Sequence, residues 1–429
     1  MILSFSEAAA ACPSLSAIYP GEETEWSETL GQLEGLFDSC LQSAEYFALR
    51  GAAQLNTGAL PQAIESLERA LLLDPDNGAA LIDYGVALYN DGQLFAALDV
   101  NQILIERDDV PEGLREQIVE RQALWQSQTV ETAYRADLSG GFDNNLNGGP
   151  RDSQIAITLS GESIYLALNE NFRSVEGPFL ISGLAAMHTR LSPGRRDALT
   201  GQIRGRFSEN RESDVIQLAG AYDVLREGRR SSIRQWLGAS HLLFSGEALF
   251  TGVDLAHRFQ LNRRSSACDR YLSAEFQHQT WHTQRLLDGV EVRAALGGLC
   301  SFNGLEGHRF GLELALLQNY ALRDRRLGGD RDGWQMRGQW QYTVGRGLLA
   351  AQIELGSLLD GVGYSPLLDD NSRRVVSRRA FNMQFLYPGS VLGRRADLTV
   401  NVYHQDQSSN IGLFKVTDTS LSIGLQINF

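Results

Sequence analysis

Histidines beside carboxylates are the first candidates for chemistry in this chain of 429 residues. His404 lies two residues before Asp406, and His308 lies two residues after Glu306. An imidazole held by a carboxylate can act as a general acid or base. The chain contains no Gly-x-Ser-x-Gly or Walker pattern that would complete a hydrolytic or nucleotide site. We therefore interpret these pairs as loop residues, and we expect neither enzymatic activity nor a bound cofactor.

The turn Asp143-Asn144-Asn145 is the first candidate for a metal site. Calcium sites combine several carboxylates with carbonyl groups and water, whereas this turn offers one carboxylate among amides. His278 and His282 do not fit a shared metal either, because four residues along a strand separate them by about 13 Å. The sequence therefore predicts no metal site.

The four cysteines fall into two sequence-local pairs, Cys12 with Cys40 and Cys268 with Cys300. Their spacings match neither a zinc site nor a Cys-x-x-Cys redox site. Two disulfides, one in each half of the chain, would fit an oxidising compartment such as the periplasm or the cell surface. Four buried thiols are the alternative.

Composition narrows the class of protein. Hydrophobic residues make up 43% of the chain. No run of about 18 apolar residues occurs, so a transmembrane helix is not expected. The formal net charge of −14 argues against nucleic acid as a partner. Basic residues are nearly all arginine, which suits fixed ion pairs in an enclosed space or reflects a GC-rich genome.

Residues 24–130 read as helices with an internal repeat, because Gly51 and Ala63 recur 34 residues later as Gly85 and Ala97. This period is typical of the tetratricopeptide (TPR) repeat, a helical hairpin that packs through small residues. The matching positions are Phe47, Gly51, Ala63, Leu67, Ala70 and Pro75, followed by Gly85 and Ala97. Stacked hairpins form a concave groove, so we expect residues 1–130 to bind a peptide or partner protein. The alternative is that they only plug or brace the rest of the chain.

From about residue 131 the apolar period changes from helical to two, as expected of strands. In 334–344, Trp, Met, Gly, Tyr and Val alternate with Gln, Arg and Thr, and 421–429 alternates similarly before finishing on Phe429. One apolar face and one face of Gln, Asn, Thr, Arg and Gly match a barrel with lipid outside and water inside. We therefore predict an all-α TPR-like array followed by an antiparallel transmembrane β-barrel over 131–429, with about 14 strands or, alternatively, 16.

Connection length predicts which end of such a barrel each segment occupies. The polar stretches 322–332 and 360–379 are predicted surface loops, whereas the short 345–347 is a predicted periplasmic turn.

The junction 134–150 reads YRADLSGGFDNNLNGGP. It resembles the opening strand and turn, of the form aGyDdNvN.aP, in a family of Gram-negative outer-membrane proteins with TPR domains. The residues that carry this resemblance, called here the barrel-opening motif, are Gly141, Asp143, Asn144, Asn145, Asn147 and Pro150. Segments 155–168 and 173–177 also look like that family. The family includes the surface lipoprotein assembly modifiers (Slam) of type XI secretion.

The resemblance implies a periplasmic TPR domain over residues 1–130 and an outer-membrane barrel over 131–429. It also implies that Phe429 is the terminal aromatic residue that barrel-assembly machinery reads. The expected function is export: a protein cargo, such as a surface lipoprotein or secreted protein, or its chaperone would bind the TPR groove. The barrel would then pass the cargo to the cell surface. The alternatives are an exopolysaccharide export porin and a structural or adhesin-associated barrel that transports nothing.

A protein of this kind needs a leader peptide. Residues 1–12 lack the basic region and full apolar core of an intact signal peptide. We expect that a leader was trimmed or that it precedes this start.

Overall fold

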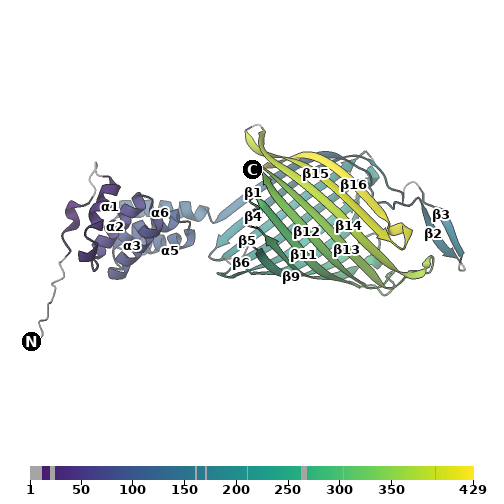
Figure 1. Ribbon diagram of the computed structural model, residues 1–429, viewed down its shortest axis with the longest axis horizontal. Helices are drawn as coiled ribbons and strands as arrows, with labels where there is room; N and C mark the ends of the chain where they lie inside the picture. Colours follow the sequence, from purple (N-terminus) through teal and green to yellow (C-terminus); the bar gives the residue numbers. More distant parts are fainter. Residues whose placement is uncertain are drawn as a thin grey trace, which may run out of the picture. The chain divides into compact units, whose positions relative to one another are not determined.

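A computed structural model describes residues 12–19, 25–159, 162–169, 172–209, 211–261, 268–302, 304–391 and 393–429 (Figure 1). The chain divides into two compact units, Met1–Val130 and Glu131–Phe429. The first is helical and the second is built of strands. In the described residues, no helix has both the length and the apolar character needed to cross a membrane. Residues 1–11, nearly all of the stretch tested above for a signal peptide, lie outside the described residues.

The first unit is a stack of helical hairpins. Its α-helices are α1 (Trp26–Glu34), α2 (Ala44–Asn56), α3 (Leu60–Leu73), α4 (Gly78–Asn90), α5 (Leu94–Glu106) and α6 (Glu112–Ser127). Ser43 and Asn77 cap α2 and α4, because their side-chain oxygens accept backbone hydrogen bonds from the first turn. Gly58 and Gly92 follow the same two helices with φ of 82° and 81°, a left-handed conformation that glycine adopts without steric cost. The 34-residue repeat thus corresponds to the helix pairs α2–α3 and α4–α5.

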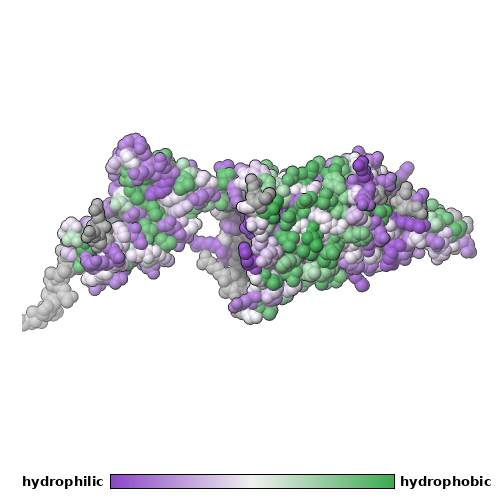
Figure 2. Space-filling view, turned by 90° about the horizontal axis from the view of Figure 1, so that it is seen from above, coloured by the Kyte–Doolittle hydropathy of each residue, from purple (hydrophilic) through white to green (hydrophobic). Residues whose placement is uncertain are grey.

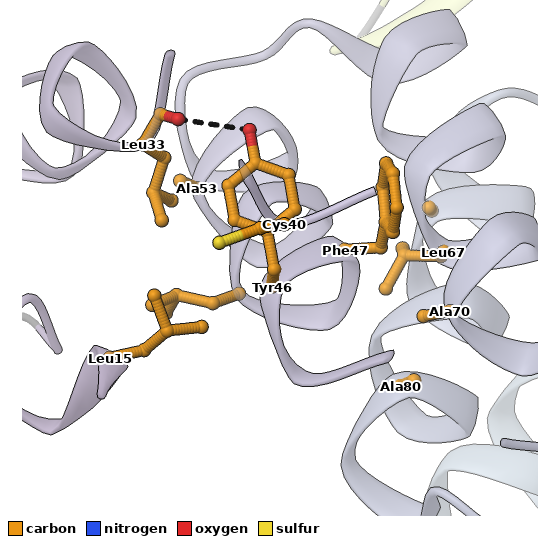
Figure 3. Packing of buried hydrophobic residues seen from close by; sticks show 11 residues of the cluster. Leu15, Leu33, Cys40, Tyr46, Phe47, Ala53, Leu67, Ala70 and Ala80 are labelled. Carbon is orange, nitrogen blue, oxygen red and sulfur yellow. Dashed lines mark hydrogen bonds between the residues drawn. The ribbon is translucent and has the colours of Figure 1, made fainter. Parts of the chain in front are cut away.

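The core of this unit lies where α2 meets its neighbours (Figure 3). Tyr46 and Phe47 are buried, and their rings meet edge to face with centroids 5.1 Å apart. The Tyr46 hydroxyl donates to the carbonyl oxygen of Leu33 at 2.9 Å, so its polar group is satisfied inside the core. A disulfide between Cys12 and Cys40 joins the segment before α1 to the segment before α2.

The second unit is a closed antiparallel barrel of 14 strands in the described residues. The strands are β1 (Val130–Asp143), β4 (Gly177–Ser192), β5 (Arg195–Ser208), β6 (Val215–Glu227), β7 (Ser231–Phe244), β8 (Glu247–Leu261), β9 (Cys268–Trp281), β10 (Gly289–Cys300), β11 (His308–Ala321), β12 (Arg331–Val344), β13 (Gly347–Ser365), β14 (Leu368–Val391), β15 (Arg394–Ser409) and β16 (Val416–Asn428). Strands from β4 onward pair with their neighbours along the chain, and β1 closes the barrel between β16 and β4. The predicted fold class and the lower of the two predicted strand numbers are confirmed.

The outer face of the barrel is apolar around its middle. Leu421, Ile423 and Leu425 of β16 point outward and are 50%, 55% and 39% exposed, whereas Ser422 between them is buried. Figure 2 shows a green apolar belt across the visible face of the barrel, between two purple polar zones. A belt of this kind is stable in lipid and would be unfavourable in water.

The strand connections define two ends of the barrel. The end that carries the start of β1 and Phe429 also carries the short turns 193–194 and 345–346, and we call it the terminal end. The opposite end carries the longer connections 144–176 and 322–330, and we call it the loop end.

The prediction that 360–379 is a loop was wrong. β13 continues to Ser365 and β14 starts at Leu368, so the two strands form a long hairpin at the loop end. Its polar residues remain in strands because the ladder continues as far as Ser365 opposite Leu368, and strand pairing does not require a lipid-facing apolar side.

Segment 155–168 lies outside the barrel wall. It forms the hairpin β2 (Gln154–Leu159) and β3 (Glu162–Ala167) within the connection between β1 and β4. The backbone N–H of Thr158 donates to the carbonyl oxygen of Leu367 at 2.9 Å, so this hairpin contacts the tip of the β13–β14 hairpin.

Candidate functional site

The inner face of the barrel is the first candidate functional surface. On β12, Gln335, Arg337 and Gln339 alternate with outward-facing apolar residues such as Trp334, which is 48% exposed. Strand register places residues of one face side by side on neighbouring strands, so a polar residue on each strand adds to a continuous polar wall. The lumen is therefore lined by amide, guanidinium and carboxylate groups.

Five neighbouring strands, β9 to β13, share an ion-pair network in this wall. Arg293 on β10 lies 2.9 Å from Glu275 and also pairs with Glu313 on β11. Arg337 on β12 lies 3.4 Å from Glu313 and 3.4 Å from Glu354. Arg293 and Glu313 are 9% and 6% exposed, so both charges depend on each other for stabilisation.

Aromatic contacts and hollows surround this network. The Tyr271 hydroxyl donates to Glu313 at 2.7 Å, and the Arg258 guanidinium lies 4.3 Å from the centre of the Tyr271 ring. One hollow of about 320 Å³ reaches Asp254 and Arg293, and another of about 360 Å³ reaches Arg258 and Arg337. The wall therefore offers charges of both signs beside these hollows.

Sequence reasoning did not find this network, because each strand contributes only one of its five charges. The available signal was the position of those charges: Glu275, Arg293, Glu313, Arg337 and Glu354 all fall on the polar side of an alternating strand. Which of them meet depends on strand register, which alternation alone does not determine.

The barrel-opening motif lies at the loop end of the seam between β1 and β16. Asp143 is 2% exposed, accepts from the backbone N–H of Asn145 at 2.7 Å and pairs with Arg206 at 3.1 Å. The Asn145 amide donates to the carbonyl oxygens of Gly149 and Thr417 at 3.0 and 2.9 Å. These bonds tie the turn to β16 and use the single carboxylate for an arginine.

The remaining motif residues also make close backbone contacts. Asn144 accepts from the backbone N–H of Thr419 at 2.7 Å, and the Asn147 amide donates to the carbonyl oxygen of Arg173 at 2.7 Å. A Cβ on Gly141 would lie 2.1 Å from the Leu421 carbonyl oxygen. Pro150 is half-buried after the turn. We interpret the motif as a clasp that holds the first long connection against the last strand.

Phe429 lies at the opposite, terminal end of the same seam. Its backbone N–H donates to Tyr134 at 2.9 Å, and Tyr134 donates back at 2.7 Å. The two rings stack with centroids 5.9 Å apart. The pair thus closes the first strand onto the last.

A second ion cluster stabilises the loop end. Asp360 on β13 is 1% exposed and lies 3.0 Å from Arg374 and 3.4 Å from Arg331. The Arg374 guanidinium lies over two rings, 4.8 Å from the centre of Tyr364 and 4.4 Å from that of Phe414. These contacts hold the β13–β14 hairpin against β12 and the connection before β16.

Neither candidate histidine is paired with its candidate carboxylate. His308 stacks on Tyr342 with centroids 4.0 Å apart and accepts from the Trp340 indole at 3.1 Å. His404 shares a hydrogen bond with Thr419 at 2.8 Å. Across the described ranges, no group of three or more His, Cys, Asp or Glu side chains is arranged to hold a metal ion.

Both predicted disulfides are confirmed. Cys12 pairs with Cys40 in the helical unit, and Cys268 pairs with Cys300. The second bond joins the adjacent ends of β9 and β10 at the terminal end of the barrel.

The helical unit is the second candidate site. Most of the TPR positions lie where helices cross: a Cβ on Gly51 would lie 2.5 Å from Leu67, and Ala63, Ala70 and Ala97 are fully buried. A Cβ on Gly85 would lie 3.4 Å from Val100, and Pro75 follows α3.

The partly buried carboxyl of Asp83 in the helical unit has a raised pKa. Burial raises the pKa of Asp83 on α4 to about 6, and nearby Arg121 on α6 partly opposes this shift. Arg121 also covers the ring of Trp125, which stacks on Tyr89 with centroids 4.7 Å apart. Asp83 on α4 and Arg121 on α6 therefore influence each other's charge.

Comparisons with known proteins show fold likeness and no sequence match. No protein-family model matches the chain, and no curated protein matches it. The Arabidopsis OM64 TPR domain is 17% identical over 24% of this chain and 81% of its own, with a TM-score of 0.22. The outer membrane channel DcaP of Acinetobacter baumannii is 8% identical over 70% of this chain and 98% of its own, with a TM-score of 0.38. An anion-selective porin from Comamonas acidovorans is 10% identical over 70% and 99%, with a TM-score of 0.37.

Proposed function

We propose that this protein is an outer-membrane export channel whose helical domain receives a protein cargo in the periplasm. The observation that carries the proposal is the combination of a polar, charge-lined barrel interior with a helical repeat array on the same chain. The barrel offers a route through lipid, and the array offers a surface for a protein before it reaches that route.

The lumen wall supports transport rather than chemistry. Its charges are paired with each other, as Arg293 is with Glu275 and Glu313. Paired charges of both signs let a polypeptide exchange contacts along the wall without binding tightly to one sign of charge. The cargo in this proposal is a surface lipoprotein or a secreted protein, as in the Slam proteins that the barrel-opening motif resembles.

The proposed orientation places residues 1–130 and the terminal end in the periplasm and the loop end at the cell surface. Phe429, stacked on Tyr134 at the seam, is in this proposal the signal that barrel-assembly machinery reads. Lipid of the outer membrane covers the apolar belt.

The test is deletion of the gene, followed by complementation with the full chain or with residues 131–429 behind a leader. Surface proteins and surface glycans are compared by protease shaving and by glycan staining. The proposal predicts loss of one or a few surface proteins, restored by the full chain but not by the barrel alone. Loss of a surface glycan would instead favour a polysaccharide exporter, and no change in either would leave a structural barrel.

A further inference from the structure

Charge is divided unequally along the chain. Residues 1–130 contain 21 acidic and 5 basic residues, whereas residues 131–429 contain 31 acidic and 33 basic residues. The terminal end of the barrel carries an excess of positive charge. The strand ends and turns there, in 190–197, 226–230, 268–270, 306–309, 346 and 394–397, contain 11 arginines and 5 carboxylates.

One hollow on the outer face combines this charge with the apolar belt. It has a volume of about 580 Å³ and is lined by residues of β4, β5 and β6, including His188, Arg190, Arg195, Leu199 and Tyr222. Leu199 and Tyr222 are 57% and 43% exposed and belong to the lipid-facing side of their strands. The hollow is thus polar toward the rim and continuous with the belt on its other side.

Arg190 and Arg195 line this hollow and Arg226 lies beside it, so arginines outnumber the one lining carboxylate, Asp197. Asp197 accepts from Arg195 at 2.7 Å and from the Tyr222 hydroxyl at 2.7 Å. Arg190 is opposite Asp197 in the strand register, and Arg226 is opposite Arg195. Among the residues that the structure describes, neither Arg190 nor Arg226 has a carboxylate within 4.0 Å. Like charges opposite each other on paired strands are destabilising, so this patch favours an anionic ligand.

We propose that this hollow binds the headgroup of an anionic phospholipid. The phosphate would lie against Arg190 and Arg226, and the acyl chains would lie along Leu199 and the outward residues Leu184 and Ile203 of the same strands. A guanidinium suits a phosphate oxygen pair, and an exposed Tyr hydroxyl suits the boundary between lipid and water. A zwitterionic lipid would add an ammonium group beside three arginines, so it should bind less well.

This inference does not depend on what the barrel exports. The test uses the purified full chain in detergent, with native mass spectrometry counting bound phosphatidylglycerol and phosphatidylethanolamine at equal concentrations. The test variant carries both Arg190→Gln and Arg226→Gln. The control variant carries both Arg270→Gln and Arg346→Gln. The control removes two arginines from the same end of the barrel but away from this hollow, one on β9 and one in the turn 345–346. Arg190→Lys with Arg226→Lys retains the charge.

The native chain should retain phosphatidylglycerol over phosphatidylethanolamine, and the Gln double variant should lose about tenfold in phosphatidylglycerol binding. The control and Lys variants should keep most of it. Equal retention of both lipids by the native chain, an equal loss in the control, or full displacement by inorganic phosphate at the same concentration would overturn the proposal. If the double variant does not fold, Arg190→Gln alone, which breaks no ion pair, decides by the same criteria.

Discussion

Glu313 is the residue on which the lumen network depends most. The residue is 6% exposed, and its carboxylate pairs with Arg293, lies 3.4 Å from Arg337 and accepts from Tyr271 at 2.7 Å. Substitution by Gln keeps the size of the side chain but removes the charge between two guanidinium groups. Removing one member of a buried ion pair costs about 3–5 kcal/mol. We expect the lower part of this range, because Arg293 keeps Glu275 as a partner.

The assay is reversible urea unfolding of the barrel in lipid vesicles, with tryptophan fluorescence as the signal. Glu354→Gln is the matched control, because Glu354 makes one contact of 3.4 Å and Arg337 would still have Glu313. The control should lose less than about 1 kcal/mol. The explanation fails if Glu313→Gln destabilises the barrel no more than Glu354→Gln does.

Three further predictions concern other parts of the chain. Asp360→Asn should leave Arg331 and Arg374 without their carboxylate and lower the free energy of local opening at the loop end by about 2–3 kcal/mol. Amide exchange in 322–330 should become faster while the barrel stays folded, and unchanged exchange would contradict the cluster's role. Replacing Cys12 and Cys40 by Ser should destabilise the helical unit by about 3–4 kcal/mol, since the disulfide spans 28 residues. Replacing Cys268 and Cys300 should cost less, because these residues join strands that are already paired. Equal losses of stability in circular dichroism melts would show that loop closure is not the cause. The helical unit should lose stability as the pH rises from about 4 to about 6. The pKa of Asp83 is raised to about 6 in the folded state, so the protonated carboxyl favours folding and its ionisation opposes folding. Asp83→Asn should remove this slope, and an unchanged slope would assign it to another group.

Sequence patterns predicted the two folds because each fold repeats at a regular interval along the chain. The 34-residue recurrence of Gly51 and Ala63 and the two-residue alternation around Trp334 each express which face is buried. They did not predict the ends of β13 and β14, because pairing beyond the membrane needs no apolar alternation. They also did not predict the Arg293–Glu313 pair, whose residues are 20 apart and meet only through strand register. The barrel-opening motif was visible in the sequence, but its bonds to Thr417 and Thr419 cross almost the whole barrel sequence and needed the closed structure.

The orientation of the barrel underlies the proposed function, and one residue tests it directly. Lys415 is the only lysine of the chain and lies at the loop end, 3.1 Å from Asp152, with its side chain 32% exposed. A bulky amine-reactive reagent that cannot cross the outer membrane should modify Lys415 on intact cells, and Lys415→Arg should abolish that modification. Modification of Lys415 only after the outer membrane is permeabilised would place the loop end in the periplasm and contradict the proposed direction of export.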